Sequence, residues 1–147
     1  MRILVDADAC PVKGIILNVA RKNNIPVIMV IDTSHVINDG YSKVITVDKA
    51  RDSVDIALVN LISPGDLVIT QDYGVAAMSL GKGVKAMNQN GMVYSDDNMD
   101  RLLFERYLGQ KVRMSGGRTS NAKKRSKHDD ERFLCALQKY VAENVER

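Results

Sequence analysis

Aspartates stand where short apolar runs of the sequence end, and this placement could support metal-dependent chemistry. Asp6 and Asp8 directly follow the apolar run 3–5, and Asp72 closely follows the run 67–70. Carboxylates held close together repel one another, which raises their pKa values unless a cation neutralises the charge. Oxygen ligands without His or Cys favour Mg²⁺ or Mn²⁺. A metal held in this way could activate a water molecule for in-line attack on a phosphodiester.

The hydrophobic pattern predicts the elements that would bring these aspartates together. Short, branched apolar runs predict strands at 3–5, 27–31, 44–47, 67–70 and 84–87, with a small edge strand at 92–94. Helical spacing predicts helices at 11–22, 50–62, 75–80, 96–108 and 129–141. We take Pro11 to open the first helix, and Asp96 or Asp97 and Asp129 to start the last two. Alternating strands and helices indicate an α/β fold in three layers, with a parallel sheet of about five strands.

The order of the strands decides which aspartates meet. In open α/β sheets, functional sites lie beyond the carboxyl ends of the strands, where the strand order reverses. A strand order of 3-2-1-4-5 makes the first and fourth strands neighbours, so Asp6, Asp8 and Asp72 should converge. Asp55 lies in the first turns of the helix after the third strand and should reach the same edge. Asp66 precedes its strand and therefore belongs to the opposite edge.

Other aspartates near this edge have a simpler explanation. A short carboxylate side chain satisfies the free backbone amides at strand ends and helix starts. We assign that capping role to Asp32, Asp48 and Asp52.

Length and composition are those of one soluble domain. The chain has 147 residues, of which 45% are hydrophobic and 27% charged, so we expect a single domain over residues 1–147. No apolar run approaches the roughly 20 residues of a membrane span, and the start lacks the pattern of a signal peptide. We therefore expect a cytoplasmic protein without a membrane partner. The two cysteines have no metal-ligand spacing and should be reduced thiols. Nothing in the sequence indicates an oligomeric state.

Charge is divided unevenly along the chain. Residues 1–100 carry nine Lys and Arg against twelve Asp and no Glu, whereas residues 101–147 carry twelve Lys and Arg against six acids. No acid lies between Arg106 and His128, and we expect a basic loop at 110–128. Such runs are usually solvated surface, but beside an acidic metal site this one favours nucleic acid as the partner. The candidate phosphate-binding residues are Lys13, His35, Arg113, Ser115, Arg118, Thr119, Lys123, Lys124 and Arg125.

Several motifs around the aspartates carry a family resemblance. In chain order they are Val5-Asp6-Ala7-Asp8-Ala9-Cys10-Pro11-Val12-Lys13, Val54-Asp55, Pro64-Gly65-Asp66-Leu67-Val68-Ile69-Thr70, Asp72 and Ser115-Gly116. The sequence thereby resembles, over nearly its whole length, the YaiI/YqxD family of uncharacterised bacterial proteins. That family itself resembles PIN and NYN domains, which are metal-dependent nucleases acting mostly on RNA. The resemblance implies a PIN-like fold, with Asp6, Asp55 and Asp72 where those nucleases place metal-binding acids and Asp8 beside them.

Together these patterns favour a phosphodiesterase that uses Mg²⁺ or Mn²⁺ and cleaves nucleic acid, RNA in preference to DNA. Asp6, Asp8, Asp55 and Asp72 are the candidate catalytic residues, and Asp6, Asp8 and Asp72 are the candidate metal ligands. Two alternatives remain open. A non-catalytic nucleic-acid-binding protein would need the basic loop and not the aspartates, whereas a small-molecule phosphohydrolase would need the aspartates and not the loop.

A third possibility is a phosphatase of the haloacid dehalogenase type. Those enzymes also begin with Asp-x-Asp after an apolar strand. They carry a second acidic pair after a later strand, and here Asp66 stands before its strand instead. The sequence therefore favours the other hypotheses.

Overall fold

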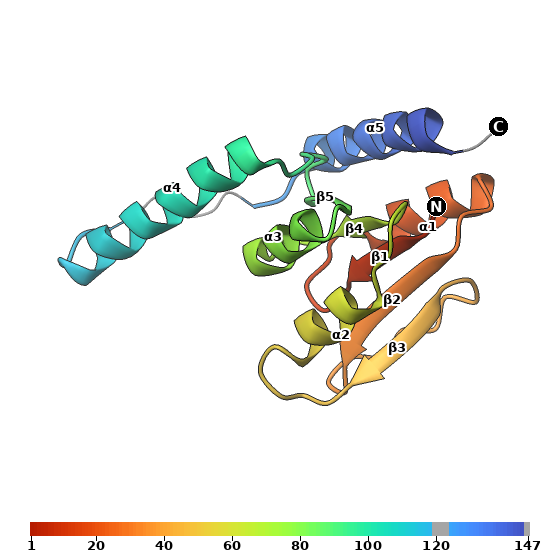
Figure 1. Cartoon of the computed structure of the whole chain (residues 1–147), viewed down its shortest axis with the longest axis horizontal. Helices are drawn as coiled ribbons and strands as arrows, with labels where there is room; N and C mark the ends of the chain where they lie inside the picture. Colours follow the sequence, from red (N-terminus) through yellow and green to blue (C-terminus); the bar gives the residue numbers. More distant parts are fainter. Residues whose placement is uncertain (119–123, 146–147) are drawn as a thin grey trace.

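The structure is a computed structural model that describes residues 1–118 and 124–145 (Figure 1). Its described strands are β1 (Ile3–Asp6), β2 (Val27–Asp32), β3 (Lys43–Val47), β4 (Leu67–Ile69) and β5 (Lys85–Met87). Its described helices are α1 (Lys13–Lys22), α2 (Ser53–Leu61), α3 (Tyr73–Gly81), α4 (Asp96–Met114) and α5 (Lys127–Asn144). In the described ranges, no helix combines the length and apolar character that crossing a membrane requires.

The five strands form one parallel sheet in the order β3-β2-β1-β4-β5. This confirms the predicted α/β class and strand order. β1 lies between β2 and β4, so its carboxyl end, with Asp6, lies beside the ends of both neighbours. β3 is an edge strand and is partly exposed, which suits its more polar sequence.

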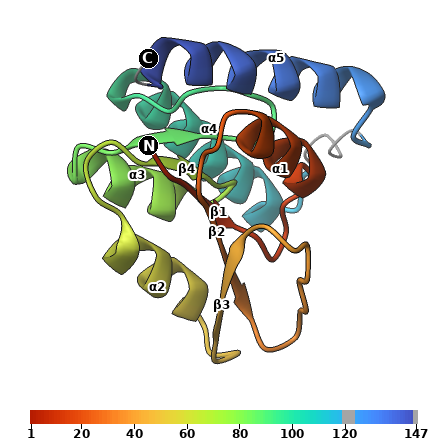
Figure 2. The same cartoon turned by 90° about the vertical axis from the view of Figure 1, so that its right-hand side faces the viewer.

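Helices cover both faces of the sheet, which explains why the central strands are almost wholly apolar. Ile3 and Val5 of β1 belong to the core formed with α1 and α5. Leu4 points to the opposite face and belongs to the core formed with α2 and α3. Figures 1 and 2 show α1 and α5 together on one side of the sheet and α2 and α3 on the other. The alternation of side chains along β1 therefore decides which helix each residue contacts.

Helix starts differ from the sequence-based prediction. α1 begins at Lys13, because residues 7–10 close a turn in which the Cys10 amide donates to the Ala7 carbonyl. Ser95 and Ser126, not the aspartates after them, are the N-caps of α4 and α5, and each forms a reciprocal capping box. A serine immediately before an acidic first turn is the stronger start signal.

The predicted basic loop at 110–128 is wrong at both ends. α4 continues to Met114 instead of ending near 108, and α5 begins at Lys127. The last turns of α4 are exposed and pack little against the core, and basic residues stand between their apolar side chains, so the helical spacing of Leu108, Val112 and Met114 is weak as a signal. They are instead rich in good helix formers such as Gln110, Lys111 and Arg113. The predicted strand at 92–94 is also reduced to one antiparallel bridge, between Met87 and Val93.

Gly91, in the loop after β5, lets that loop approach α5 closely. Its φ is +86°, and a Cβ built on it would lie 2.5 Å from the Cβ of Ala136 in α5. Gly40 has a similar φ of +72° but faces open space. The two glycines therefore share the backbone constraint and differ in the contact with the helix.

We predict that Gly91→Ala lowers the free energy of unfolding by about 1–3 kcal/mol more than Gly40→Ala does. Both substitutions place a side chain at positive φ, but only the alanine at 91 displaces α5. Urea unfolding of the two variants measures the difference. Equal losses would contradict the close contact between the loop and α5.

Candidate functional site

Two groups of acidic side chains lie at the carboxyl edge of the sheet. The first, the Asp6 group, contains Asp6, Asp55 and Asp72. The second, the Asp8 group, contains Asp8, Asp32 and His35. Both groups exist because β1 lies centrally in the parallel sheet: β2 ends beside it with Asp32, and β4 leads into Thr70 and Asp72.

The Asp6 group is built around a buried threonine. The Thr70 hydroxyl donates to Asp6 Oδ2 at 2.9 Å and accepts from the Asp72 amide at 3.0 Å. Burial raises the pKa of Asp6 above its ordinary value, the Thr70 hydrogen bond lowers it in part, and the charges of Asp72 and Asp8 raise it further. Asp72 also caps α3, accepting from the Val75 amide at 3.0 Å. Helix capping therefore explains the position of the Asp72 carboxylate in part, whereas Asp6 caps no helix.

Asp55 joins this group from the first turn of α2. Burial raises the pKa of Asp55 to about 6, and the charges of Asp72, Asp6 and Asp52 raise it as well. The three carboxylates of the Asp6 group thus feel one another's charge. A divalent cation would relieve this repulsion.

The Asp8 group is more tightly clustered. His35 Nδ1 lies 3.0 Å from Asp8 Oδ1 and 3.3 Å from Asp32 Oδ1, and the Asp32 amide donates to Asp8 Oδ1 at 3.1 Å. One ligand atom from each of the three residues lies within 4.8 Å of the others. The side chain and amide of Ser34 donate to Asp32 and hold the pKa of Asp32 below its usual range. Asp32 is therefore ionised and oriented, as a metal ligand must be.

The donors of the Asp8 group fit a divalent metal ion. Two carboxylates and one imidazole nitrogen suit Mn²⁺, Fe²⁺ or Zn²⁺ as well as Mg²⁺. Nδ1 of His35 faces both carboxylates and lies within hydrogen-bonding distance of each.

The structure arranges the predicted site residues differently from the sequence-based hypothesis. Asp6, Asp55 and Asp72 lie near enough for their charges to act on one another, whereas Asp8 lies with Asp32 and His35, and among the described residues these are the three whose ligand atoms lie within 4.8 Å of one another. Asp32 accepts a hydrogen bond from the Ser34 backbone amide, as its predicted capping role requires, and it also contacts His35 because it ends the strand next to β1. The sequence does not single out Thr70 as a site residue, because threonine is common at strand ends. Asp66 lies at the other edge, as expected, in an ion pair of 2.7 Å with Arg2.

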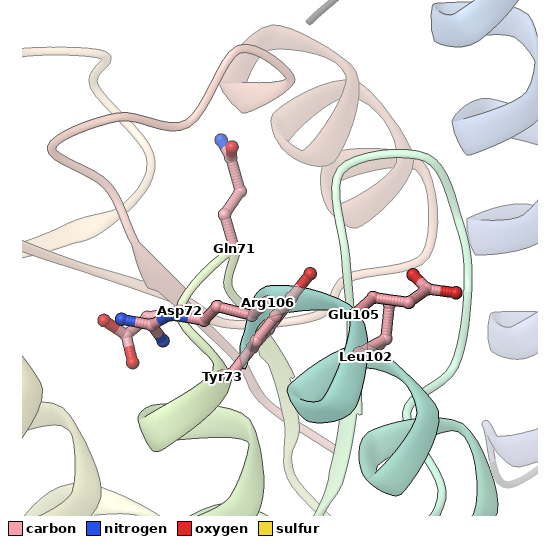
Figure 3. A pocket seen from close by; sticks show the side chains of 6 residues that line it. All are labelled: Gln71, Asp72, Tyr73, Leu102, Glu105 and Arg106. Carbon is pink, nitrogen blue, oxygen red and sulfur yellow. The ribbon is translucent and has the colours of Figure 1, made fainter. Parts of the chain in front are cut away.

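An open cavity of about 450 Å³ adjoins the Asp6 group (Figure 3). Gln71, Asp72 and Tyr73 line it from the start of α3, and Leu102, Glu105 and Arg106 line it from α4. Figure 3 shows the Arg106 side chain reaching across the cavity toward Asp72, while Glu105 points away. The cavity thus places a cation and an aromatic ring beside a candidate catalytic carboxylate.

The predicted phosphate-binding residues are scattered. Lys13 donates to the Ala7 carbonyl at 3.1 Å, close to the Asp8 group, and His35 belongs to that group. The Ser115 hydroxyl donates to carbonyls of its own helix. Three more of these residues are exposed: Arg113, Arg118 and Lys124. Thr119 and Lys123 lie outside the described residues.

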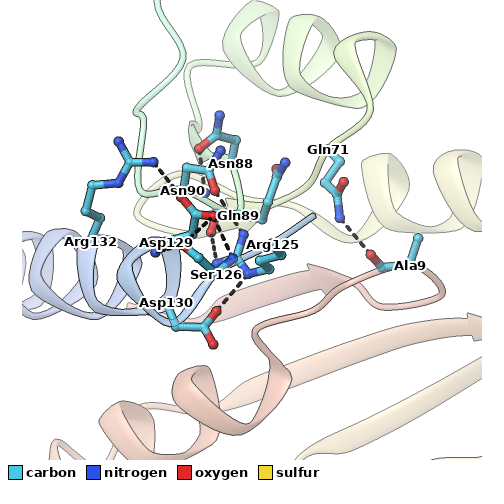
Figure 4. A network of polar contacts seen from close by, with 10 residues as sticks. All are labelled: Ala9, Gln71, Asn88, Gln89, Asn90, Arg125, Ser126, Asp129, Asp130 and Arg132. Carbon is cyan, nitrogen blue, oxygen red and sulfur yellow. Dashed lines mark hydrogen bonds and ion pairs between the residues drawn. The ribbon is translucent and has the colours of Figure 1, made fainter. Parts of the chain in front are cut away.

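Arg125 serves the fold (Figure 4). Its guanidinium donates to Asp130 Oδ1 at 2.7 Å, Asn90 Oδ1 at 2.9 Å and the Gln89 carbonyl at 2.7 Å. These bonds fasten the start of α5 to the loop after β5. Its contacts therefore give no support to the prediction that Arg125 binds nucleic acid.

Comparison with known proteins places the chain in a family. The family model described as the uncharacterised YaiI/YqxD family, DUF188, matches residues 4–143. The chain belongs to the YaiI/YqxD family. The family's description names no reaction, so membership assigns no activity to the chain.

Curated relatives resemble the YaiI/YqxD chain over nearly its full length. A "UPF0178 protein" of Ruminiclostridium cellulolyticum is 68% identical over 141 residues, which cover 96% of this chain and 92% of the relative. Another, from Clostridium kluyveri, is 58% identical and covers 90% and 88% of the two chains. A third, from Alkaliphilus oremlandii, is 50% identical and covers 99% and 94%. The comparison with solved structures finds no match.

The raised pKa of Asp55 predicts a pH dependence of stability in metal-free protein. Because the pKa is higher in the folded state, about 6 against an ordinary 3.8, the carboxyl stabilises the fold fully below pH 4 and loses that contribution as pH rises through 6. Asp55→Asn should remove this slope and raise the free energy of unfolding at pH 7.5 by about 1–2 kcal/mol, a figure reduced for solvent screening.

Urea unfolding in the presence of a chelator, from pH 4 to 7.5, measures this effect. Asp48→Asn is the matched control, because it removes an exposed carboxylate shortly before the same helix whose charge is not among those that raise the pKa of Asp55. An Asp55→Asn variant with the wild-type pH profile would contradict the crowding of the Asp6 group.

Proposed function

We propose that this protein is a metal-dependent phosphodiesterase that cleaves RNA. The observation that carries the proposal is the presence of two acidic groups on one sheet edge. Burial and like charge raise the pKa values of Asp6 and Asp55 in the first group, and the ligand atoms of Asp8, Asp32 and His35 lie within 4.8 Å of one another in the second. Such crowding costs stability, and catalytic sites are where folds accept it.

Each group has its own part in the proposal. Asp8, Asp32 and His35 hold the divalent metal ion, which supplies Lewis acidity and an activated water when bound. Asp6 and Asp72 complete the acidic edge and are held in place through Thr70. Asp55, which reaches the same edge from the first turn of α2, would be the candidate to accept a proton from the attacking water.

The cavity beside Asp72 provides the place for the substrate. Arg106 would contact phosphate oxygens, with its charge offsetting the repulsion between the acids and the nucleic-acid backbone. The ring of Tyr73 would stack on a base, as aromatic side chains do in single-stranded RNA recognition. RNA, in preference to DNA, is supported by the resemblance of the family to PIN and NYN domains. Mn²⁺ or Mg²⁺ is the proposed cofactor.

A small-molecule phosphohydrolase is the second candidate. The cavity of about 450 Å³ lies within the range of pockets that enclose small ligands. The same carboxylates would serve it, and the basic residues after Arg106 would be dispensable. Substrate assays separate the two candidates.

The metal site predicts the outcome of calorimetric titration with Mn²⁺. Asp8→Asn, Asp32→Asn and His35→Gln should each weaken binding at least about tenfold, because each removes a donor from the same ion. Asp48→Asn is the matched control, since it changes an exposed aspartate that follows β3 outside both groups. Wild-type affinity in all three variants would exclude the Asp8 group as the metal site.

The nuclease proposal predicts cleavage of labelled single-stranded RNA in Mn²⁺ or Mg²⁺. Asp72→Asn should reduce the cleavage rate at least about a hundredfold while RNA binding persists. Arg106→Ala should mainly raise KM, because it removes a phosphate contact. The Asp72→Asn protein, purified identically, also measures any contaminating ribonuclease.

Three results would overturn or redirect this proposal. Equal cleavage by wild type and Asp72→Asn would exclude the Asp6 group from catalysis. RNA binding by wild type without cleavage in either metal would favour a non-catalytic binding protein. Hydrolysis of a small phosphate ester, with RNA left intact, would favour the phosphohydrolase.

A further inference from the structure

Helix α4 exposes a row of large apolar side chains that the fold leaves uncovered. The helix leaves the body of the protein in Figure 1, and of its residues only Met99 is buried. The exposed fractions are 45% for Leu103, 60% for Phe104, 51% for Tyr107 and 46% for Leu108. Four neighbouring side chains of this size are unusual on a solvated helix and indicate a contact surface.

These residues form one stripe with Asp100 on one side of it and Lys111 on the other, and Met114, which is 81% exposed, continues the same face beyond Lys111. At 3.6 residues per turn, Asp100, Leu103, Phe104, Tyr107, Leu108 and Lys111 fall within about 140° of the helix surface. The ammonium group of Lys111 lies 5.5 Å from the centre of the Tyr107 ring, which places Lys111 on the stripe. The cavity-lining residues Leu102, Glu105 and Arg106 fall on the other side of the helix. The stripe is therefore free of the candidate site.

The stripe is complementary to the same stripe of a second copy that runs in the opposite direction. Its midpoint lies between residues 105 and 106, and each member has a counterpart equally far beyond that point. An antiparallel second copy would place Leu103 against Leu108 and Phe104 against Tyr107. It would also place Asp100 of each copy against Lys111 of the other. A parallel pairing would instead bring like charges together, which is unfavourable.

We propose that two copies of this chain associate through α4, packed antiparallel about a two-fold axis at residues 105–106. The pairing covers the four apolar side chains from Leu103 to Leu108 and places an Asp100–Lys111 ion pair on each side of them, while Met114 stays outside the paired segment. Antiparallel helices also align their dipoles favourably. From Asp100 to Lys111 the stripe is only about 17 Å long, so the dimer should dissociate in about the micromolar range. The proposal does not rest on the proposed activity.

Sedimentation of the full chain across about 1–200 µM tests the association. The wild type should approach twice its monomer mass of 16.3 kDa as concentration rises. Phe104→Glu should stay monomeric, because it buries a charge in the centre of the interface. Ile56→Glu is the matched control, since Ile56 is 58% exposed on α2 and should leave the dimer intact. A monomeric wild type, or a dimer that persists in Phe104→Glu, would overturn the proposal.

Charge exchange tests the antiparallel register. Asp100→Lys and Lys111→Asp should each raise the dissociation constant about tenfold, because each creates two like-charge contacts. The double variant Asp100→Lys/Lys111→Asp should restore wild-type association. Failure of the double variant to recover would overturn the register. If Phe104→Glu loses RNA binding while its sedimentation mass equals that of the wild type, the stripe contacts RNA and the dimer proposal is overturned.

Discussion

Repulsion between carboxylates at the carboxyl edge of the sheet is the constraint on which this structure depends. The parallel order places β1 between β2 and β4, so the acids that follow these strands meet at one place. α2 adds Asp55 to them from its first turn. Burial and mutual charge raise the pKa values of Asp6 and Asp55, while Ser34 keeps Asp32 ionised. The repulsion at this edge lowers the free energy of unfolding of the metal-free protein, and a bound cation would raise it again.

Much of this edge could be predicted from the sequence, because position in a parallel sheet follows from the alternation of elements. The strand ends and the strand order were enough to predict that three of these acids lie near one another: Asp6, Asp55 and Asp72. Asp32 could not be separated from a capping residue, since its role depends on the Ser34 and His35 side chains that fold back onto it. The separation of Asp8 from Asp6 likewise depends on side-chain direction, which hydrophobic spacing does not encode.

The predicted end of α4 at 108 falls short of its observed end at Met114, because few of its side chains are buried. Sequence periodicity detects a helix through the face that it buries, and α4 buries little beyond Met99. Its uncovered residues, Leu103, Phe104, Tyr107 and Leu108, lie on the side away from the cavity. α4 thus has two distinct faces. One lines the cavity beside Asp72, and the other is the exposed apolar stripe proposed to contact a second copy. A dimer formed there would fix the helix that carries Arg106 and so limit how the cavity can change shape.

The central claim is that the acidic edge holds a divalent cation at Asp8, Asp32 and His35. A crystal structure of the protein grown with Mn²⁺, with anomalous diffraction recorded to locate the ion, tests it most directly. We predict one anomalous peak within bonding distance, about 2.0–2.3 Å, of a carboxylate oxygen of Asp8, one of Asp32 and a ring nitrogen of His35. A fully ordered edge with no peak, or a peak bound only by residues outside the Asp8 group, would contradict the account.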